Sequence, residues 1–257
     1  LVAGGDLVMA YGSEKIIPVD SEHSALFQAM SAGRASDVSK LILTASGGPF
    51  RDRQDLSQVK LADALAHPTW SMGPVVTINS ATLVNKGLEI IEAHYLFSIA
   101  YSKIEAVIHP QSIVHSLVEF KDGSTLAQAS PPDMKGPIAY ALAYPNRVGG
   151  AMAPINWNSK QSWDFEPIDE KRFPAVELAR RAGALGSSVA AIYNAANEVA
   201  VAAFMKEEIA FTAIVDTIEK VVDKLSASAP SRIRDISDVS AIEQDARIYA
   251  REVLEKG

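Results

Sequence analysis

Two carboxylates stand two residues apart in the segment Pro18-Val19-Asp20-Ser21-Glu22-His23 and could bind a metal ion. The segment follows a β-branched run over 15–19, which we predict to be a strand. In an extended chain, residues i and i+2 project to the same side, so Asp20 and Glu22 would point together. Neighbouring carboxylates repel each other unless a cation lies between them, and hard oxygen ligands suit Mg²⁺ or Mn²⁺. The alternative is a helix start with Asp20 or Ser21 as its N-cap.

A second polar group lies where we predict a strand over 75–78 to be followed by a helix over 81–97. Ser80 and Thr82 would stand at the start of that helix. Free backbone N–H groups and the helix dipole favour an anion there, and phosphate is one such anion.

The same predicted helix carries Asn85, Lys86 and Glu89 within one turn. Lys86 and Glu89, three residues apart, would share a helix face. These residues fit a phosphate site beside a carboxylate that completes a metal site. They also fit an ordinary surface Lys–Glu pair, which Glu92 would continue and which contributes little to stability.

Two loops are candidates for closing over a ligand. In Thr44-Ala45-Ser46-Gly47-Gly48-Pro49-Phe50, the glycines after Ser46 would let the backbone approach a ligand closely, although such a sequence is usually only a turn. A polar stretch then ends in His67-Pro68-Thr69-Trp70-Ser71-Met72-Gly73. A long connection of this kind could act as a lid, or Trp70 and Met72 could fill the core.

Two further polar segments have commoner structural explanations. In His109-Pro110-Gln111-Ser112-Ile113-Val114-His115, the last residue leads into a predicted strand. His115 could line a pocket, but a hydrogen-bonded core histidine is more usual. Asn194-Ala195-Ala196-Asn197-Glu198 lies in an apolar helix, where we expect the amides to satisfy neighbouring backbone groups.

These residues must be positioned by the expected strands and helices. From the pattern of those elements we predict an α/β (α+β) domain with a mostly buried sheet. Its further strands are expected over 41–44 and 104–108, and a hairpin over 114–120 and 124–128 would turn at Lys121-Asp122-Gly123. After Pro174, apolar residues at helical spacing predict helices to about 186, over 189–204, over 211–225 and over 239–255, which form a small bundle. We therefore predict a catalytic, metal- and substrate-binding domain over 1–146, a linker over 147–172 and a helical domain over 173–257.

Composition narrows the class of protein. The 257 residues include 48% hydrophobic residues, enough for a sizeable core, and no cysteine for a disulfide framework. Lys and Arg number 24 against 31 Asp and Glu, a net charge of −7 that argues against nucleic acid as a partner. We also expect no membrane partner, because no apolar run approaches the ~20 residues of a membrane span.

Taken together and in this order, these segments resemble the 1-deoxy-D-xylulose 5-phosphate reductoisomerases, a family of the non-mevalonate isoprenoid pathway. The stretches that carry the resemblance are PVDSEH (18–23), TASGGPF (44–50), HPTWSMG (67–73), NSATLVNKGLEIIEA (79–93), HPQSIVHS (109–116), PPDM (131–134) and NAANEVAVAAF (194–204). They run from end to end of the chain and are specific in combination.

The resemblance implies an enzyme that isomerises and reduces deoxyxylulose phosphate, a small phosphorylated sugar, to methylerythritol phosphate. It implies NADPH and a divalent metal, Mg²⁺ or Mn²⁺, as cofactors. The implied metal ligands are Asp20, Glu22 and Glu89, with Glu22 and Glu89 also catalytic. The implied substrate-binding residues are Ser21, Glu22, Ser46, His67, Ser80, Asn85, Lys86 and Glu89. Trp70 and Met72 would belong to a flap, and Gly73 would lie near the nicotinamide.

The sequence also departs from the family pattern. Asn79, Thr69 and Lys135 stand where Asp, Asn and Arg are usual, and none replaces an implied ligand. No G-x-G-x-x-G motif follows an initial strand, and the chain opens on Leu1-Val2 without a Met. We therefore expect a truncated chain that lacks the family's N-terminal NADPH-binding domain and is inactive or poorly active by itself.

Further expectations concern partners and competing functions. A homodimer through the sheet of residues 104–128 is plausible because an exposed strand edge invites pairing. The compartment would be a bacterial cytoplasm or a plastid. Two alternatives remain open: a related metal-dependent oxidoreductase with another substrate, and a non-catalytic dimerisation module whose carboxylates are structural.

Overall fold

The computed structural model describes residues 1–12, 15–230 and 232–256, and the packing divides the chain into two units. The helical unit comprises Leu1–Gly12, Gly47–Phe97 and Asp169–Gly257, and the sheet unit comprises Ser13–Ser46 and Ser98–Ile168. The segments of the two units therefore alternate along the chain. The sequence boundaries at 146/147 and 172/173 follow changes in residue pattern instead, and they remain a prediction.

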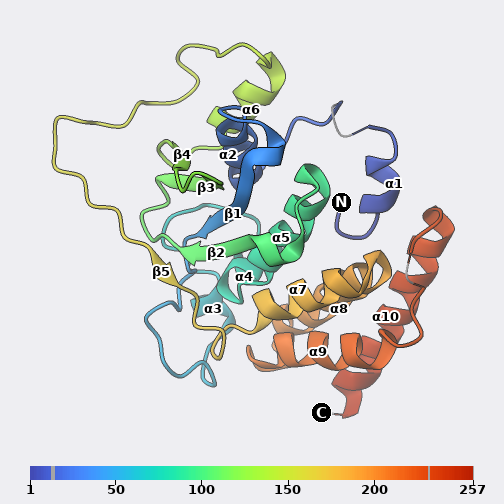
Figure 1. The fold of residues 1–257 in the computed structure, drawn as a ribbon. Coiled ribbons are helices and arrows are strands. Elements are labelled where there is room, and N and C mark those ends of the chain that lie inside the picture. The colour runs from blue at the N-terminus through green and yellow to red at the C-terminus, as the bar shows by residue number, and fades with distance from the viewer. Residues whose placement is uncertain (13–14, 231, 257) are drawn as a thin grey trace. The chain divides into compact units, whose positions relative to one another are not determined.

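The sheet unit is built on five strands in the order β4-β3-β1-β2-β5 (Figure 1). They are β1 (Val38–Ala45), β2 (Ile104–Ile108), β3 (Val114–Phe120), β4 (Thr125–Ala129) and β5 (Glu166–Pro167). β1 pairs with β2 in parallel, and the other pairs are antiparallel. Because β1 is central, its apolar side chains such as Leu41 and Leu43 are fully buried.

Helices and turns complete the sheet unit. α2 (Ser21–Met30) packs on β3 and β4, and α6 (Lys135–Ala143) packs on α2. Short 3₁₀ helices, η2 (Ala35–Asp37) and η3 (Tyr101–Lys103), precede β1 and β2. The predicted hairpin is confirmed, since β3 and β4 pair across a turn in which Gly123 has a φ of +85°.

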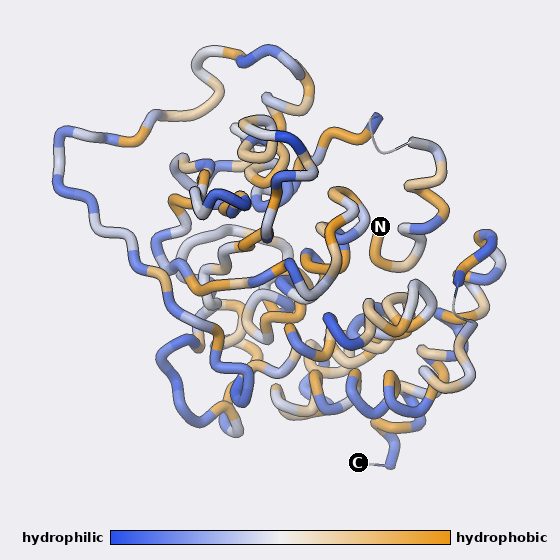
Figure 2. Tube along the Cα trace, in the orientation of Figure 1, coloured by the Kyte–Doolittle hydropathy of each residue, from blue (hydrophilic) through white to orange (hydrophobic). Residues whose placement is uncertain are grey.

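The helical unit contains α1 (Gly5–Met9), α3 (Leu61–Ala64), α4 (Pro74–Ala81), α5 (Val84–Phe97), α7 (Ala175–Leu185), α8 (Ser187–Met205), α9 (Ala213–Leu225) and α10 (Ile236–Lys256). Figure 2 shows hydrophobic and hydrophilic residues alternating along α9 and α10, the pattern of helices with one buried face. α8 is the central helix of this unit. Among the helices of the described residues, α8 is long and apolar enough to span a membrane. However, 72% of its apolar 18-residue stretch is buried inside the protein.

Two predicted strands are wrong. Residues 75–78 lie inside α4, because Gly73 occupies the N-cap position, Pro74 is the first helical residue, and the Thr77 hydroxyl donates to the Gly73 carbonyl at 2.9 Å. Residues 15–19 form no strand; their run contains Pro18, which has no N–H to donate to a ladder. The predicted fold class, an α/β sheet domain followed by helices, is confirmed.

Candidate functional site

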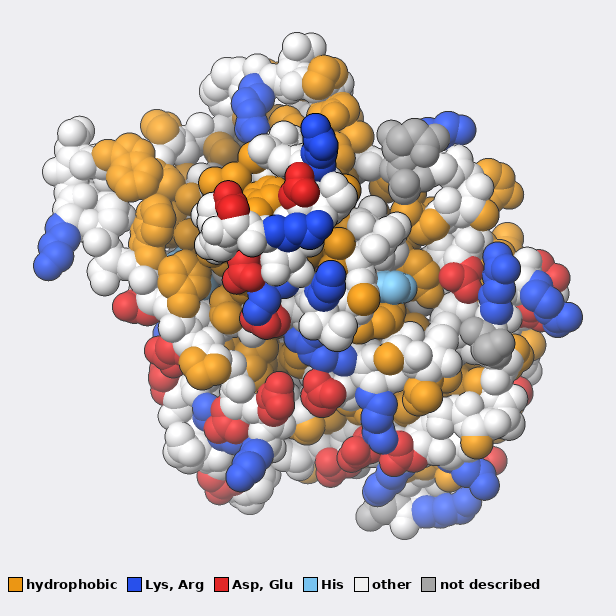
Figure 3. Space-filling view, viewed as in Figure 1, with side chains coloured by type: hydrophobic (Ala, Val, Ile, Leu, Met, Phe, Trp, Pro, Cys, Tyr) orange, Lys and Arg blue, Asp and Glu red, His pale blue; other side chains and the backbone are white. Residues whose placement is uncertain are grey.

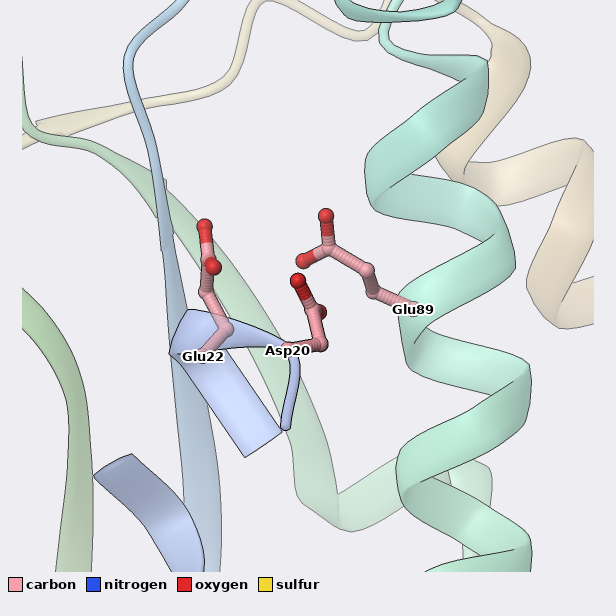
Figure 4. Close-up of side chains that lie close together, drawn as sticks. All are labelled: Asp20, Glu22 and Glu89. Carbon is pink, nitrogen blue, oxygen red and sulfur yellow. The ribbon is translucent and has the colours of Figure 1, made fainter. Parts of the chain in front are cut away.

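Asp20 occupies the N-cap position of α2, so the helix-start interpretation of this segment describes its backbone correctly. Yet the Asp20 side chain makes no capping hydrogen bond to the helix. Its Oδ2 instead lies 3.2 Å from Nδ1 of His23, a buried histidine. The carboxylate therefore serves a purpose other than capping, and Figure 4 shows it beside that of Glu22 at the start of α2.

Glu22 lies in the first turn of α2, where the helix dipole stabilises a negative charge. The Ser21 hydroxyl donates a hydrogen bond to its carboxylate. Asp20 and Glu22 thus share the first turn of a helix rather than the end of a strand. The predicted pair of neighbouring carboxylates is present, but a helix start brings it about.

His115 is buried on β3, where its Nε2 lies 3.1 Å from the carbonyl oxygen of Ser130. Burial lowers the pKa of His115, while the negative charge of Glu22 opposes that shift. The ring also lines a cavity of about 40 Å³ together with Ser21. Both predictions for His115 are therefore correct, since it is a hydrogen-bonded core histidine that also lines a pocket.

Glu89 and Lys86 form an ion pair on α5 in the helical unit, and Figure 4 shows the Glu89 side chain projecting from that helix. The Asn85 amide donates a second hydrogen bond to the same carboxylate. Lys86 and Glu89 are each only 4% exposed, so an ordinary surface pair is excluded. Burying an ion pair costs desolvation energy that its attraction barely repays, so such a pair is weak evidence for a purely stabilising role.

The turn between α4 and α5 corrects the predicted anion position. Ser80 lies in the last turn of α4, not at a helix start. Thr82 does stand before a helix, and its hydroxyl accepts a hydrogen bond from the Val84 N–H at 3.3 Å. Leu83, with a φ of +58°, makes the sharp turn. The helix N-terminus that favours an anion is therefore that of α5, whose first turn contains Asn85 and Lys86 and no acidic residue.

The glycine loop packs against the end of α4. Gly48 has a φ of +63°, and a Cβ there would lie 2.9 Å from the Ser80 carbonyl oxygen, so only glycine fits. Ser46, two residues earlier, directly follows the end of β1. The paired glycines thus allow a close approach to the backbone of Ser80 itself.

The segment 67–73, which contains the predicted flap residues Trp70 and Met72, has no regular structure and lies between α3 and α4. Trp70 and Met72 are both half-exposed, so the core-filling alternative is wrong. Nδ1 of His67 accepts hydrogen bonds from the N–H groups of Thr69 and Trp70, at 3.1 and 2.9 Å. Burial, and secondarily the charge of Arg51, lowers the pKa of His67, which favours the neutral ring that these bonds require.

Three further polar residues have hydrogen-bonding environments that the sequence did not specify, and one of them, Asn194, differs from the expectation. Nε2 of the fully buried His109 accepts from the N–H groups of Ile113 and Val114, each at 3.1 Å, and so fixes the segment that leads to His115. On α8 the Asn194 amide donates to the Glu198 carboxylate at 3.0 Å, not to backbone. The buried side-chain oxygen of Asn79, Oδ1, has no hydrogen-bond partner among the described residues. Sequence offered no signal for these partners.

Family models match two parts of the chain. One, described as the DXP reductoisomerase C-terminal domain, matches residues 129–249. The other, described as the 1-deoxy-D-xylulose 5-phosphate reductoisomerase C-terminal domain, matches residues 16–97.

Curated relatives carry the same name. The 1-deoxy-D-xylulose 5-phosphate reductoisomerase of Kitasatospora griseola is 55% identical over 256 residues, which cover 98% of this chain and 66% of the relative. That of Leifsonia xyli subsp. xyli is 58% identical over 226 residues, 87% of this chain and 63% of the relative. The chain therefore spans just under two thirds of the length of these relatives.

Solved structures agree. A DOX-P reductoisomerase in complex with NADPH, fosmidomycin and magnesium is 38% identical, with a TM-score of 0.92 over 99% of this chain and 68% of that one. The reductoisomerase of Zymomonas mobilis in complex with NADPH is 41% identical, with a TM-score of 0.90 over 99% of this chain and 66% of that one. This chain belongs to the 1-deoxy-D-xylulose 5-phosphate reductoisomerase family.

Proposed function

We propose that the protein converts 1-deoxy-D-xylulose 5-phosphate to 2-C-methyl-D-erythritol 4-phosphate with NADPH and a divalent metal ion. The observation that carries the proposal is the buried Glu89 carboxylate, held by Lys86 and Asn85 at the start of α5. A buried charge kept beside a helix N-terminus suits a site that binds a cation and a phosphate together.

Asp20, Glu22 and Glu89 are the proposed ligands of Mg²⁺ or Mn²⁺. They are exposed, half-buried and buried respectively, and each offers a hard carboxylate oxygen. When bound, a divalent ion would polarise the substrate carbonyl and stabilise the alkoxide that develops during the rearrangement.

The substrate phosphate is the proposed partner of the polar residues around α4 and α5. Lys86 supplies a positive charge, and Asn85 lies in the first turn of the same helix. Ser46, Ser80, His67 and Ser21 complete the proposed substrate-binding set. Binding energy from the phosphate, remote from the reacting carbons, would orient the small reacting end.

The flap is the proposed cover of the bound substrate. Trp70 and Met72 are half-exposed on a segment without regular structure, so they are available to close over a ligand and exclude water. Gly73, at the N-cap of α4, is the residue proposed near the nicotinamide. NADPH would supply the hydride, and the protein would orient it.

A second copy of the chain is the proposed protein partner. β4 is an edge strand of the described sheet, and its residues are mostly exposed. In Figure 3, hydrophobic side chains gather over the segment between α6 and β5, and exposed residues of that segment include Val148 and Trp157. Sedimentation should detect a dimer at micromolar concentration, and a monomer there would refute this partner.

Turnover by the complete gene product tests the proposed reaction. We expect loss of NADPH absorbance only when deoxyxylulose phosphate and a divalent ion are both present. Oxidation of NADPH with a different hydroxyketone instead would favour a related oxidoreductase. If a chelator neither abolishes turnover nor lowers the melting temperature, and Asp20→Asn binds ligand normally, the carboxylates are structural.

A further inference from the structure

Arg172 connects the start of the C-terminal helices to a loop more than one hundred residues earlier in the chain. Its Nη1 donates to the carbonyl oxygen of Arg53 at 2.7 Å, and its Nη2 donates to that of Arg51 at 2.9 Å. Nε donates to Asp169 Oδ2 at 2.8 Å. Every nitrogen of the guanidinium is thus engaged, in the fixed planar geometry that distinguishes arginine from lysine.

The Arg172 side chain is itself held in place. It is only 19% exposed, and its guanidinium lies over the ring of Phe173 at 5.2 Å. Asp169 also accepts from the N–H groups of Lys171 and Arg172, each at 3.2 Å, so the turn before α7 is fixed by its own hydrogen bonds. A fixed donor of this kind determines where its acceptors lie.

The acceptors belong to residues 47–53, which we call the 47–53 loop. Phe50 in this loop is buried against the ring of Phe211, at a centroid distance of 5.1 Å. Gly48 contacts the backbone of Ser80 at the end of α4. Arg172, Phe211 and Ser80 therefore hold the loop at three points, and Ser80 is a proposed phosphate residue.

The same loop leads to the base of the flap. Arg53 Nη1 lies 3.6 Å from Asp63 Oδ2. The same Asp63 oxygen accepts from the Lys60 N–H at 3.1 Å at the start of α3. α3 ends three residues before His67, so a displacement of Arg53 would be passed on to the first residue of the flap.

We propose that Arg172 is a positioning residue, which fixes the 47–53 loop and thereby aligns Ser80 and the base of the flap for the phosphorylated substrate. This inference rests on the proposed function and deepens it. Arg172 touches neither the proposed metal ligands nor the proposed phosphate residues among the described contacts. Its loss should therefore weaken phosphate-dependent binding and leave metal binding intact.

Arg181 provides a matched control. Its guanidinium joins α7 to α9 within the same helical unit, at 2.9 Å from Asp223 and 3.5 Å from Glu219, far along the chain from the 47–53 loop. Arg172→Ala and Arg181→Ala each remove one arginine side chain that connects two segments of the helical unit. A merely structural effect would appear in both variants.

The experiment compares wild type, Arg172→Ala, Arg172→Lys and Arg181→Ala in the complete gene product. We expect Arg172→Ala to raise KM for deoxyxylulose phosphate and Kd for fosmidomycin by about tenfold or more, since small misplacements of binding groups are costly. Kd for Mn²⁺ and KM for NADPH should stay unchanged. Arg172→Lys keeps the charge but not the planar donor set. It should therefore reverse less than half of the increase in KM for deoxyxylulose phosphate and in Kd for fosmidomycin, measured on a logarithmic scale. Equal KM values in Arg172→Ala and Arg181→Ala, or full restoration by Arg172→Lys, would overturn the proposal.

Hydrogen exchange separates this inference from the proposed function. Amides of residues 50–53 and 61–73 should exchange faster in Arg172→Ala than in Arg181→Ala, whichever substrate the wild type turns over. Unchanged exchange overturns the positioning role even in an active enzyme. Absence of turnover by the wild type, with faster exchange in Arg172→Ala, would instead refute the reaction and leave the loop assignment supported.

Discussion

Substitution of Gly87 by alanine should destabilise the helical unit, although alanine is the better helix former. Gly87 lies in α5, and a Cβ there would be 2.7 Å from the Ala179 Cβ, 3.0 Å from the Tyr193 hydroxyl and 3.2 Å from the Ala175 carbonyl oxygen. Ala179 has no flexible end to move, so α5 or α7 must shift. The close approach of these helices explains why glycine stands at this position.

The expected change in the free energy of unfolding is the sum of three contributions, of which two are destabilising and one is stabilising. Overpacking a well-packed core costs about 1–3 kcal/mol. Disturbing the buried hydrogen bond from Tyr193 to the Ala175 carbonyl, 3.1 Å long, costs about 1 kcal/mol. The gain in helix propensity offsets about 1 kcal/mol. The net loss for Gly87→Ala is therefore about 1–3 kcal/mol in the free energy of unfolding.

Urea denaturation measures this loss, with Gly4→Ala as the control. A Cβ at Gly4 meets no atom within 4 Å, so that variant should stay close to wild type in its free energy of unfolding. The shift of α5 should also weaken binding of Mn²⁺, because Glu89 lies half a turn beyond Gly87. An unfolding free energy for Gly87→Ala equal to or above that of wild type would refute the packing argument.

Three further predictions concern single side chains of the helical unit. Lys86→Ala should cost about 3 kcal/mol in urea denaturation, because it leaves the buried carboxylate of Glu89 without its cation; a cost below about 1 kcal/mol would contradict the buried pair. Tyr193→Phe, which removes only a hydrogen bond to the backbone of α7, should cost about 0.5–1.5 kcal/mol in the same assay, and no loss would refute that bond. His67 has a pKa lowered from 6.5, so the stability that its neutral ring gives the flap is complete above that pH and is lost as the pH falls toward the lowered pKa. NMR titration should show the pKa of His67 rising in Arg51→Ala, and an unchanged pKa would exclude the influence of that charge.

Local patterns were sufficient for much of the fold. The continuous apolar run over 41–44 and the turn at Gly123 predicted β1 and the β3–β4 hairpin, because burial and glycine conformation are encoded within a few residues. The run over 75–78 misled because its β-branched residues favour strands, while the decisive signal, Gly73-Pro74 at a helix start, lies outside the run.

Long-range packing could not be predicted in this way. Nothing in the spacing of Gly87 indicates that Tyr193 and Ala179 lie against it, since those contacts join segments about a hundred residues apart. The contacts of Arg172 could not be predicted from the sequence for a related reason. Its partners are backbone carbonyls, which every residue possesses and which leave no signature in a sequence.

The candidate ligands came from motifs, whereas the chemistry of each came from the structure. Asp20 and Glu22 were recognised as a pair, but the expected strand geometry was replaced by a helix start. The spacing of Lys86 and Glu89 fitted either a phosphate and metal site or a surface pair, and only their burial excludes the surface pair.

The central claim is that Asp20, Glu22 and Glu89 bind one divalent ion. Calorimetric titration of the protein with Mn²⁺ in the presence of fosmidomycin, a phosphonate, tests this claim. We expect heat of binding for the wild type, and at least about a tenfold weaker affinity for Asp20→Asn, Glu22→Ala and Glu89→Gln, since each removes one ligand. Glu92→Gln, on the same helix as Glu89 and outside the proposed set, should bind like the wild type. No heat with the wild type, or equal heat for Glu22→Ala, would contradict the account.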